Sequence, residues 1–135
     1  MQDVIAIELR AVDGAVLTFR LTGSTTRETY FVVSVKNSWL AASADASTYV
    51  SGSPGTLFGD LAKNWRGWEG EKSWSDLEGR VVLTATADLK GHVDVKVLLK
   101  GSYFQDRAEV HLMFEAGMLE NIGRQVDALF DRHAP

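Results

Sequence analysis

Four carboxylates of this 135-residue chain lie among tryptophans, a pattern that could support carbohydrate chemistry. They are Glu69, Glu71, Asp76 and Glu78. Glycoside hydrolysis needs two carboxyl groups held at a set separation across a cleft. Arg66 and Lys72 can neutralise these acids locally, and nothing in the stretch indicates a cleft. The pattern therefore favours a solvated, salt-bridged loop and predicts no catalytic residue.

His92 and His111 form the second set of residues whose types could do chemistry. Both fall on the polar faces of strands expected to be hairpin partners, where Asp94 or Glu109 could lie beside them. Such His and carboxylate sets bind transition metals. A one-residue slip in register would separate the faces, and a catalytic zinc needs three protein ligands that the sequence does not place. We therefore expect exposed strand histidines, with no metal site and no cofactor.

Other catalytic patterns find no support. The chain has no cysteine, which excludes disulfides, cysteine nucleophiles and thiolate zinc sites. It has no G-x-S-x-G elbow, no phosphate loop and no dinucleotide fingerprint. The segment Ser53-Pro54 is better explained as a helix cap followed by a first-turn proline.

Bulk composition predicts one domain over residues 1–135, large enough to bury a single core. The net charge is −4 and the basic residues are scattered, so we expect no nucleic-acid partner. No apolar run is long enough to span a bilayer, and Met1 leads directly into an alternating strand without a signal-peptide pattern. The expected location is the cytoplasm.

Hydrophobic periodicity predicts the elements that position these residues. Apolar and polar residues alternate over 4–10, 39–49 and 80–88, in a return strand carrying Leu17, Phe19 and Leu21, from Val93 to Leu99, and again up to about Glu115. Residues 28–36 are apolar on both faces, which is typical of a central strand covered on both sides. Helical spacing starts after Pro54, continues through Leu61 to Trp65, which is expected in the core, and should stop at Gly67. A second helix covers 117–132, with Glu120 and Arg124 as a pair four residues apart and an apolar stripe made of Met118, Leu119, Ile122, Val126, Leu129 and Phe130. Asp13-Gly14 predicts a type I′ hairpin turn.

This element order predicts an α+β fold. We expect about seven antiparallel strands, as one curled sheet or two packed sheets, with one inserted helix and one C-terminal helix. The inward positions of the fourth strand are Leu40, Ala42, Ala44 and Ala46, so a bulky element should lie close against them. The inserted helix is the expected neighbour. Residues 68–74 are expected to form an ordered loop pinned by tryptophans.

The central stretch carries the pattern F-x-x-L-A-x-x-W-x-G-W-x-G-x-K-x-W-x-x-L-E-G from Phe58 to Gly79, followed by Leu83-Thr84-Ala85-Thr86 and Gly91-His92-Val93. Over nearly the whole chain this resembles an uncharacterised bacterial family of short proteins, a domain of unknown function. Proteins of this size and architecture often serve as immunity proteins for bacterial toxins, which is an analogy of scale rather than of motif.

Three functional hypotheses follow. The first is a non-enzymatic protein-binding module, of the immunity type, that uses the loop 66–76 and its residues Trp68, Glu69, Glu71, Lys72 and Trp74 as an aromatic anchor ringed by charges. In the competing structural interpretation the indoles are buried and lock the loop. The second is a small-molecule or carbohydrate binder, possibly an enzyme, with a pocket between sheet and helix lined by Tyr30, Trp39, Trp65 and Phe114. The third is a homodimer rather than a monomer.

Overall fold

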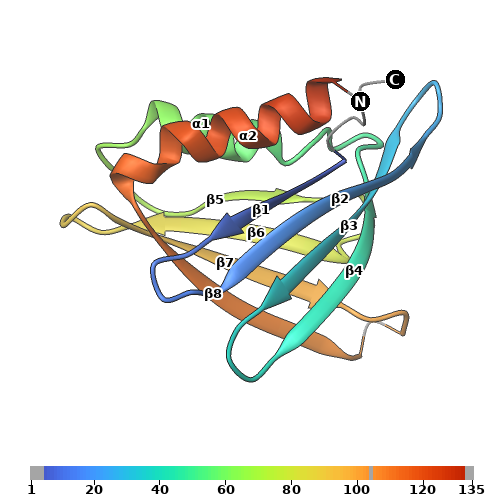
Figure 1. The fold of residues 1–135 in the computed structure, drawn as a ribbon, viewed down its shortest axis with the longest axis horizontal. Coiled ribbons are helices and arrows are strands. Elements are labelled where there is room, and N and C mark those ends of the chain that lie inside the picture. The colour runs from blue at the N-terminus through green and yellow to red at the C-terminus, as the bar shows by residue number, and fades with distance from the viewer. Residues whose placement is uncertain (1–4, 104, 133–135) are drawn as a thin grey trace.

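The computed structural model describes residues 5–103 and 105–132, which form two four-stranded antiparallel sheets and two helices (Figure 1). The first sheet has the order β1-β2-β3-β4 and the second β5-β6-β7-β8. The first comprises β1 (Ala6–Arg10), β2 (Val16–Ser24), β3 (Thr29–Lys36) and β4 (Ala41–Ser47). The second comprises β5 (Lys72–Ser75), β6 (Val81–Ala87), β7 (His92–Lys100) and β8 (Arg107–Glu115). The helices are α1 (Gly55–Lys63) and α2 (Leu119–Arg132), and a 3-10 turn, Ala116–Met118, leads into α2.

The two helices lie side by side across one opening between the sheets, with α1 next to β5 and α2 next to β1 (Figure 1). The space beneath them is filled by aromatic rings whose neighbouring centroids lie 4.9 to 6.3 Å apart. These rings belong to Phe19, Phe31, Phe58, Trp74 and Phe130. The edge-to-face geometry of most pairs adds to the energy of burial. This cluster joins both helices to both sheets.

Alternating residues of every long strand point into this core, as the periodicity predicts. Leu17, Phe19 and Leu21 of β2 are buried, as are Leu83 of β6 and Val95 of β7. The C-terminal helix likewise buries most of its predicted stripe, whose buried members are Leu119, Ile122, Val126, Leu129 and Phe130. Along the sequence, each half of the chain consists of four strands followed by one α-helix, although the two halves share no residue pattern.

The prediction of about seven strands is wrong in one place, because residues 72–75 form the short strand β5. Its partner is β6, with Trp74 opposite Leu83. Gly67 (117°) and Gly70 (75°) have positive φ and turn the chain just before β5. Because both glycines precede residue 72, they do not prevent residues 72–75 from forming a strand. The alternative of two packed sheets, rather than one curled sheet, is the arrangement present.

The alanines of β4 face the second sheet rather than the inserted helix. β4 lies close to β6 and β7. Packed sheets usually stand about 10 Å apart, and side chains as small as Ala42 and Ala44 let the two sheets approach more closely. The predicted close neighbour therefore exists, but it is a sheet.

The first hairpin differs from the predicted type I′ turn. Ala11 and Ala15 close a three-residue loop, in which the Ala11 N–H donates to Ala15 O at 2.8 Å. Only Gly14, at φ 93°, takes positive φ, as is usual for a three-residue loop that ends in a bulge.

No helix among the described residues is long and apolar enough to cross a membrane.

Candidate functional site

The loop between α1 and β5 is built by two successive turns. Asn64 ends α1, and its N–H donates to Asp60 O and Leu61 O, both at 3.1 Å. The Gly67 N–H then donates to Asn64 O at 2.8 Å. The helix therefore stops at Lys63, four residues earlier than the predicted end at Gly67. This early end of the helix leaves Trp65 on the turn that follows α1.

Trp65 lies outside the helix and 51% of its surface is exposed, so its predicted place in the core is wrong. The guanidinium carbon of Arg66 lies 5.1 Å from the centroid of the Trp65 ring. Beside the indole is an open hollow of about 500 Å³, bordered by α1 and by the 3-10 turn before α2. Small residues line it, namely Ala62, Ala116 and Gly117, together with Lys63 and Glu120. An exposed aromatic ring next to such a hollow is a typical anchor point for a protein partner.

Trp68 is half-buried and packs against the core. Lys72 Nζ lies 5.8 Å from the centroid of its ring and 2.9 Å from Asp60 Oδ2. Asp60 Oδ1 also accepts a bond of 3.0 Å from the Asn64 side chain. One lysine thus joins β5, α1 and the tryptophan loop. The indole Nε1 of Trp68 is buried and has no hydrogen-bond partner among the described residues.

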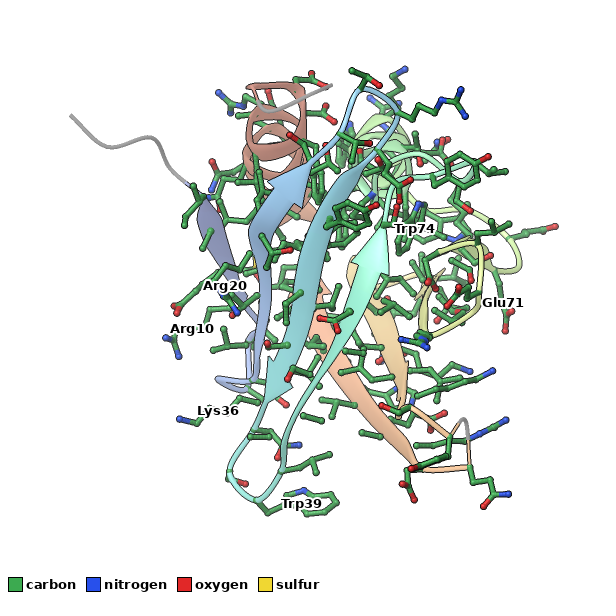
Figure 2. All side chains as sticks on the ribbon, turned by 90° about the vertical axis from the view of Figure 1, so that its right-hand side faces the viewer. Arg10, Arg20, Lys36, Trp39, Glu71 and Trp74 are labelled. Atoms are coloured by element: carbon green, nitrogen blue, oxygen red, sulfur yellow. The ribbon has the colours of Figure 1, made fainter. Side chains whose placement is uncertain are left out.

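Trp74 is 5% exposed and belongs to the core, so its predicted role in a contact surface is wrong. Its ring centroid lies 6.0 Å from that of Phe31. Figure 2 shows Trp74 beside the end of β4, whereas Glu71 lies in the loop at the surface. Glu69 and Glu71 are both exposed. Trp65, Trp68 and the two exposed glutamates all belong to the segment between α1 and the start of β5, which we call the tryptophan surface (residues 65–72).

The four carboxylates near the tryptophans have separate surroundings. Asp76 is buried, and its Oδ1 accepts the Val81 N–H at 3.0 Å, which fixes the turn before β6. Glu78 Oε2 lies 3.3 Å from Arg80 Nε. Asp76 and Glu78 border a hollow of about 250 Å³ that Glu69 and Glu71 do not line. The prediction that Arg66 and Lys72 neutralise these four acids is wrong for the described residues, because Lys72 pairs with Asp60 of α1 and Glu78 pairs with Arg80.

The two histidines lie on the same outward face but not side by side. His111 pairs with Lys96 across β7 and β8, whereas His92 pairs with Glu115. His111 Nδ1 lies 2.8 Å from Asp94 Oδ2, and His92 Nδ1 lies 2.9 Å from Asp88 Oδ2. Over residues 5–103 and 105–132, no three His, Asp or Glu side chains are arranged to hold a metal ion.

The predicted pocket between sheet and helix is wrong. Phe114 is fully buried in the core, while Tyr30, Trp39 and Trp65 are exposed on β3, on the β3–β4 turn and after α1. The aromatic cluster occupies the space where the pocket was expected. Its four proposed lining residues therefore do not meet.

Sequence reasoning missed Trp65 because its spacing from Leu61 fits one more helical turn. The signal that could have located it is Asn64, since asparagine has low helix propensity and readily ends helices. A helix ending at that residue leaves Trp65 on the turn that follows, where helical spacing no longer predicts burial.

One comparison with known proteins supports the predicted resemblance to a family of unknown function. A family model described as a family of unknown function (DUF6228) matches residues 10–133. No curated protein and no solved structure matches the chain. Because the match covers nearly the whole sequence, the chain belongs to the DUF6228 family.

Proposed function

We propose that this member of the DUF6228 family is a non-enzymatic protein-binding module of the immunity type, and that the tryptophan surface is its contact site. The observation that carries the proposal is the exposure of Trp65 beside a hollow of about 500 Å³. Tryptophan is among the residues most enriched in binding hot spots. A partner side chain that enters the neighbouring hollow can contact both the Trp65 indole and the small residues that line the hollow.

The charges around Trp65 supply specificity. Lys63 at the end of α1 and Arg66 lie next to Trp65, and the exposed glutamates Glu69 and Glu71 follow in the same loop. Rim charges of this kind steer a partner of complementary charge and reject others more than they add affinity. A partner with basic groups placed to meet the two glutamates fits this surface.

The lysine contact described above keeps the surface in one conformation. Lys72 holds Asp60 at 2.9 Å and covers the Trp68 ring, so the loop is attached to α1 and β5 before any partner arrives. A preformed contact surface loses less conformational entropy on binding than a flexible loop would. The filled interior, where the aromatic rings pack, favours this function over the binding of a small molecule inside the domain.

The test compares proteins captured from a lysate of the source cells by immobilised wild-type protein and by two tryptophan variants. Trp65→Ala removes the anchor, whereas Trp39→Ala removes another indole that is 80% exposed on the distant β3–β4 turn. We expect a specific partner to be retained by the wild type and by Trp39→Ala and lost with Trp65→Ala. Retention of the same proteins by Trp65→Ala would contradict the proposed site.

The immunity-type part of the proposal needs a second readout. Any captured partner is purified, and its enzymatic or growth-inhibiting activity is measured with and without the wild-type chain. An immunity function requires inhibition by the wild type and its loss with Trp65→Ala. A partner that binds without any change of activity leaves a binding module but excludes the immunity type.

A further inference from the structure

Among the residues that the structure describes, β4 pairs only with β3, which makes it an edge strand. In an antiparallel pair, residues that exchange backbone hydrogen bonds with the neighbour alternate with residues whose backbone groups face away. The bonds from Asn37 N–H to Leu40 O (2.9 Å) and from Thr48 N–H to Thr29 O (3.0 Å) fix this alternation at both ends of β4. The backbone groups that face away from β3 are therefore those of Ala41, Ser43, Asp45 and Ser47.

This edge lacks the usual protection against pairing with another chain. Within the described residues, the outward backbone groups of β4 make no hydrogen bond to another backbone group. Its sequence, AASADAS, contains one charge, Asp45. The long edge strand β8 is different, because charged side chains occupy most of its outward-facing positions and Met113 O accepts the Val12 N–H at 2.8 Å. Natural edges are generally guarded by such charges or contacts.

The beginning of β4 has a cation and an exposed indole next to it. Lys36 is the cross-strand partner of Ala41, and Trp39 is 80% exposed on the preceding turn. Both line an open hollow of about 920 Å³ on the outward face of the first sheet, whose acidic members Glu8 and Asp13 lie on its far side. Lys36 makes no ion pair with any described residue. Figure 2 shows Lys36 and Trp39 at this end of the sheet, with Arg10 and Arg20 on the same face.

The opposite end of β4 is acidic and also carries an exposed ring. Glu28 Oε1 accepts a 2.6 Å bond from the Ser47 hydroxyl. Glu28 and Asp45 line a hollow of about 250 Å³ with Tyr30 and Tyr49, both partly exposed. The turn before β6 forms the other wall of this hollow, and its Asp76 and Glu78 outnumber its one cation, Arg80. β4 thus runs from a basic end that carries a tryptophan to an acidic end that carries tyrosines.

We propose that β4 pairs in antiparallel fashion with β4 of a second copy of this chain, so that the two first sheets form one continuous eight-stranded sheet. Full overlap of the strands is centred on Ala44 and pairs Ala41 with Ser47 of the second copy, and Ser43 with Asp45. In the pair formed by Ala41 and Ser47 of the second copy, Lys36 lies beside Ala41 and the second copy's Glu28 lies beside its Ser47. The two-fold axis produces this arrangement at both ends of the contact. The Trp39 turn of each copy comes beside Tyr49 of the other.

The charges favour a second copy of this chain as the partner. A strand that adds antiparallel to β4 must place acidic groups beside the basic start of β4 and basic groups beside its acidic end. β4 of a second copy has this arrangement, because a two-fold axis reverses the strand and joins unlike ends. Backbone pairing supplies the contact, and the charges fix the register.

The test measures the mass of the intact protein by sedimentation equilibrium over a wide range of concentration. Ser43→Pro removes an N–H that faces the open edge, a position where a sheet tolerates proline. Glu109→Pro is the matched control, because Glu109 occupies the equivalent outward-facing position on β8. We expect the wild type and Glu109→Pro to approach twice the monomer mass as concentration rises, and Ser43→Pro to stay monomeric with unchanged circular dichroism.

A charge exchange keeps the proposal testable if Ser43→Pro fails to fold. Lys36→Glu should raise the dimer Kd by about tenfold, since it places like charges at both ends of the contact. Adding Glu28→Lys to that variant should restore much of the affinity. A wild type that stays monomeric at every concentration, association unchanged by Ser43→Pro or Lys36→Glu, or loss of the dimer with Glu109→Pro would each overturn pairing through β4.

Discussion

Trp74 Nε1 donates a 3.2 Å hydrogen bond to the carbonyl oxygen of Gly52, 22 residues earlier in the chain. This bond ties β5 of the second sheet to the loop that leads into α1, while the Trp74 ring packs on Phe31 of the first sheet. A single side chain thus connects three parts of the fold. Its burial explains why an indole in a charged segment contributes to the core.

We predict that Trp74→Ala lowers the free energy of unfolding by about 3 to 5 kcal/mol, because it leaves a large cavity between the sheets. The exposed Trp65 provides the control, since Trp65→Ala should change that free energy by no more than about 1 kcal/mol. Urea titration followed by circular dichroism measures both values. Equal losses for the two variants would contradict the assignment of Trp74 to the core.

Much of the scaffold could be predicted because alternation of apolar and polar residues is a local signal. Val93, Val95 and Val97 are buried as expected, and so are Leu119 and Val126 of the C-terminal helix. The helix pair formed by Glu120 and Arg124 is also present, at 3.8 Å. These features depend on residues two or four positions apart, which the sequence displays directly.

The candidate site was harder to predict because its geometry depends on distant contacts. Trp65, Trp68 and Trp74 occur within ten residues, yet the first is exposed, the second half-buried and the third buried. What separates them is the end of α1 at Lys63 and the pairing of β5 with β6. Neither follows from composition, since both depend on partners elsewhere in the fold. The register that separates His92 from His111 was hidden for the same reason.

The contact between Lys72 and Asp60 gives a second prediction. The lysine side chain is 26% exposed and the aspartate side chain 47%, so solvent screens the pair. A double-mutant cycle with Lys72→Met and Asp60→Asn should give a coupling energy of about 0.2 to 1 kcal/mol, and high salt should reduce it. Lys72→Met should also make Trp68 more accessible to acrylamide. A coupling energy of zero at low salt would mean that the contact does not hold the loop.

The crossing of the two helices depends on Gly123. A Cβ at this position would lie 3.2 Å from Phe58 O and 3.4 Å from Ala62 Cβ, both on α1. Gly123→Val should therefore force the helices apart and lower the free energy of unfolding by about 1 to 3 kcal/mol. Gly117→Val is the control, because nothing lies within 4 Å of a Cβ there. Thermal melts compare the two, and similar losses in both would show that β-branching rather than the helix contact is responsible.

The turn between β6 and β7 should make stability depend on acid pH through Asp88. Its carboxylate accepts hydrogen bonds from the backbone N–H of His92 (2.9 Å) and of Lys90 (2.8 Å), and it contacts the His92 ring. These bonds, above all that from the His92 N–H, lower the pKa of Asp88 from 3.8 to about 2. The folded state therefore favours the ionised carboxylate. Its stabilising effect is complete above the unfolded pKa and is lost as pH falls towards about 2.

The prediction is that the melting temperature of the wild type exceeds that of Asp88→Ala at neutral pH, and that the difference shrinks from about pH 4 to about pH 2. Asp88→Asn is the informative control, because its side-chain oxygen still accepts the two backbone bonds but has no proton to gain. Its difference from Asp88→Ala should therefore stay nearly constant over this range. A wild-type advantage that persists unchanged at pH 2 would show that turn geometry, and not the ionised carboxylate, is what Asp88 contributes.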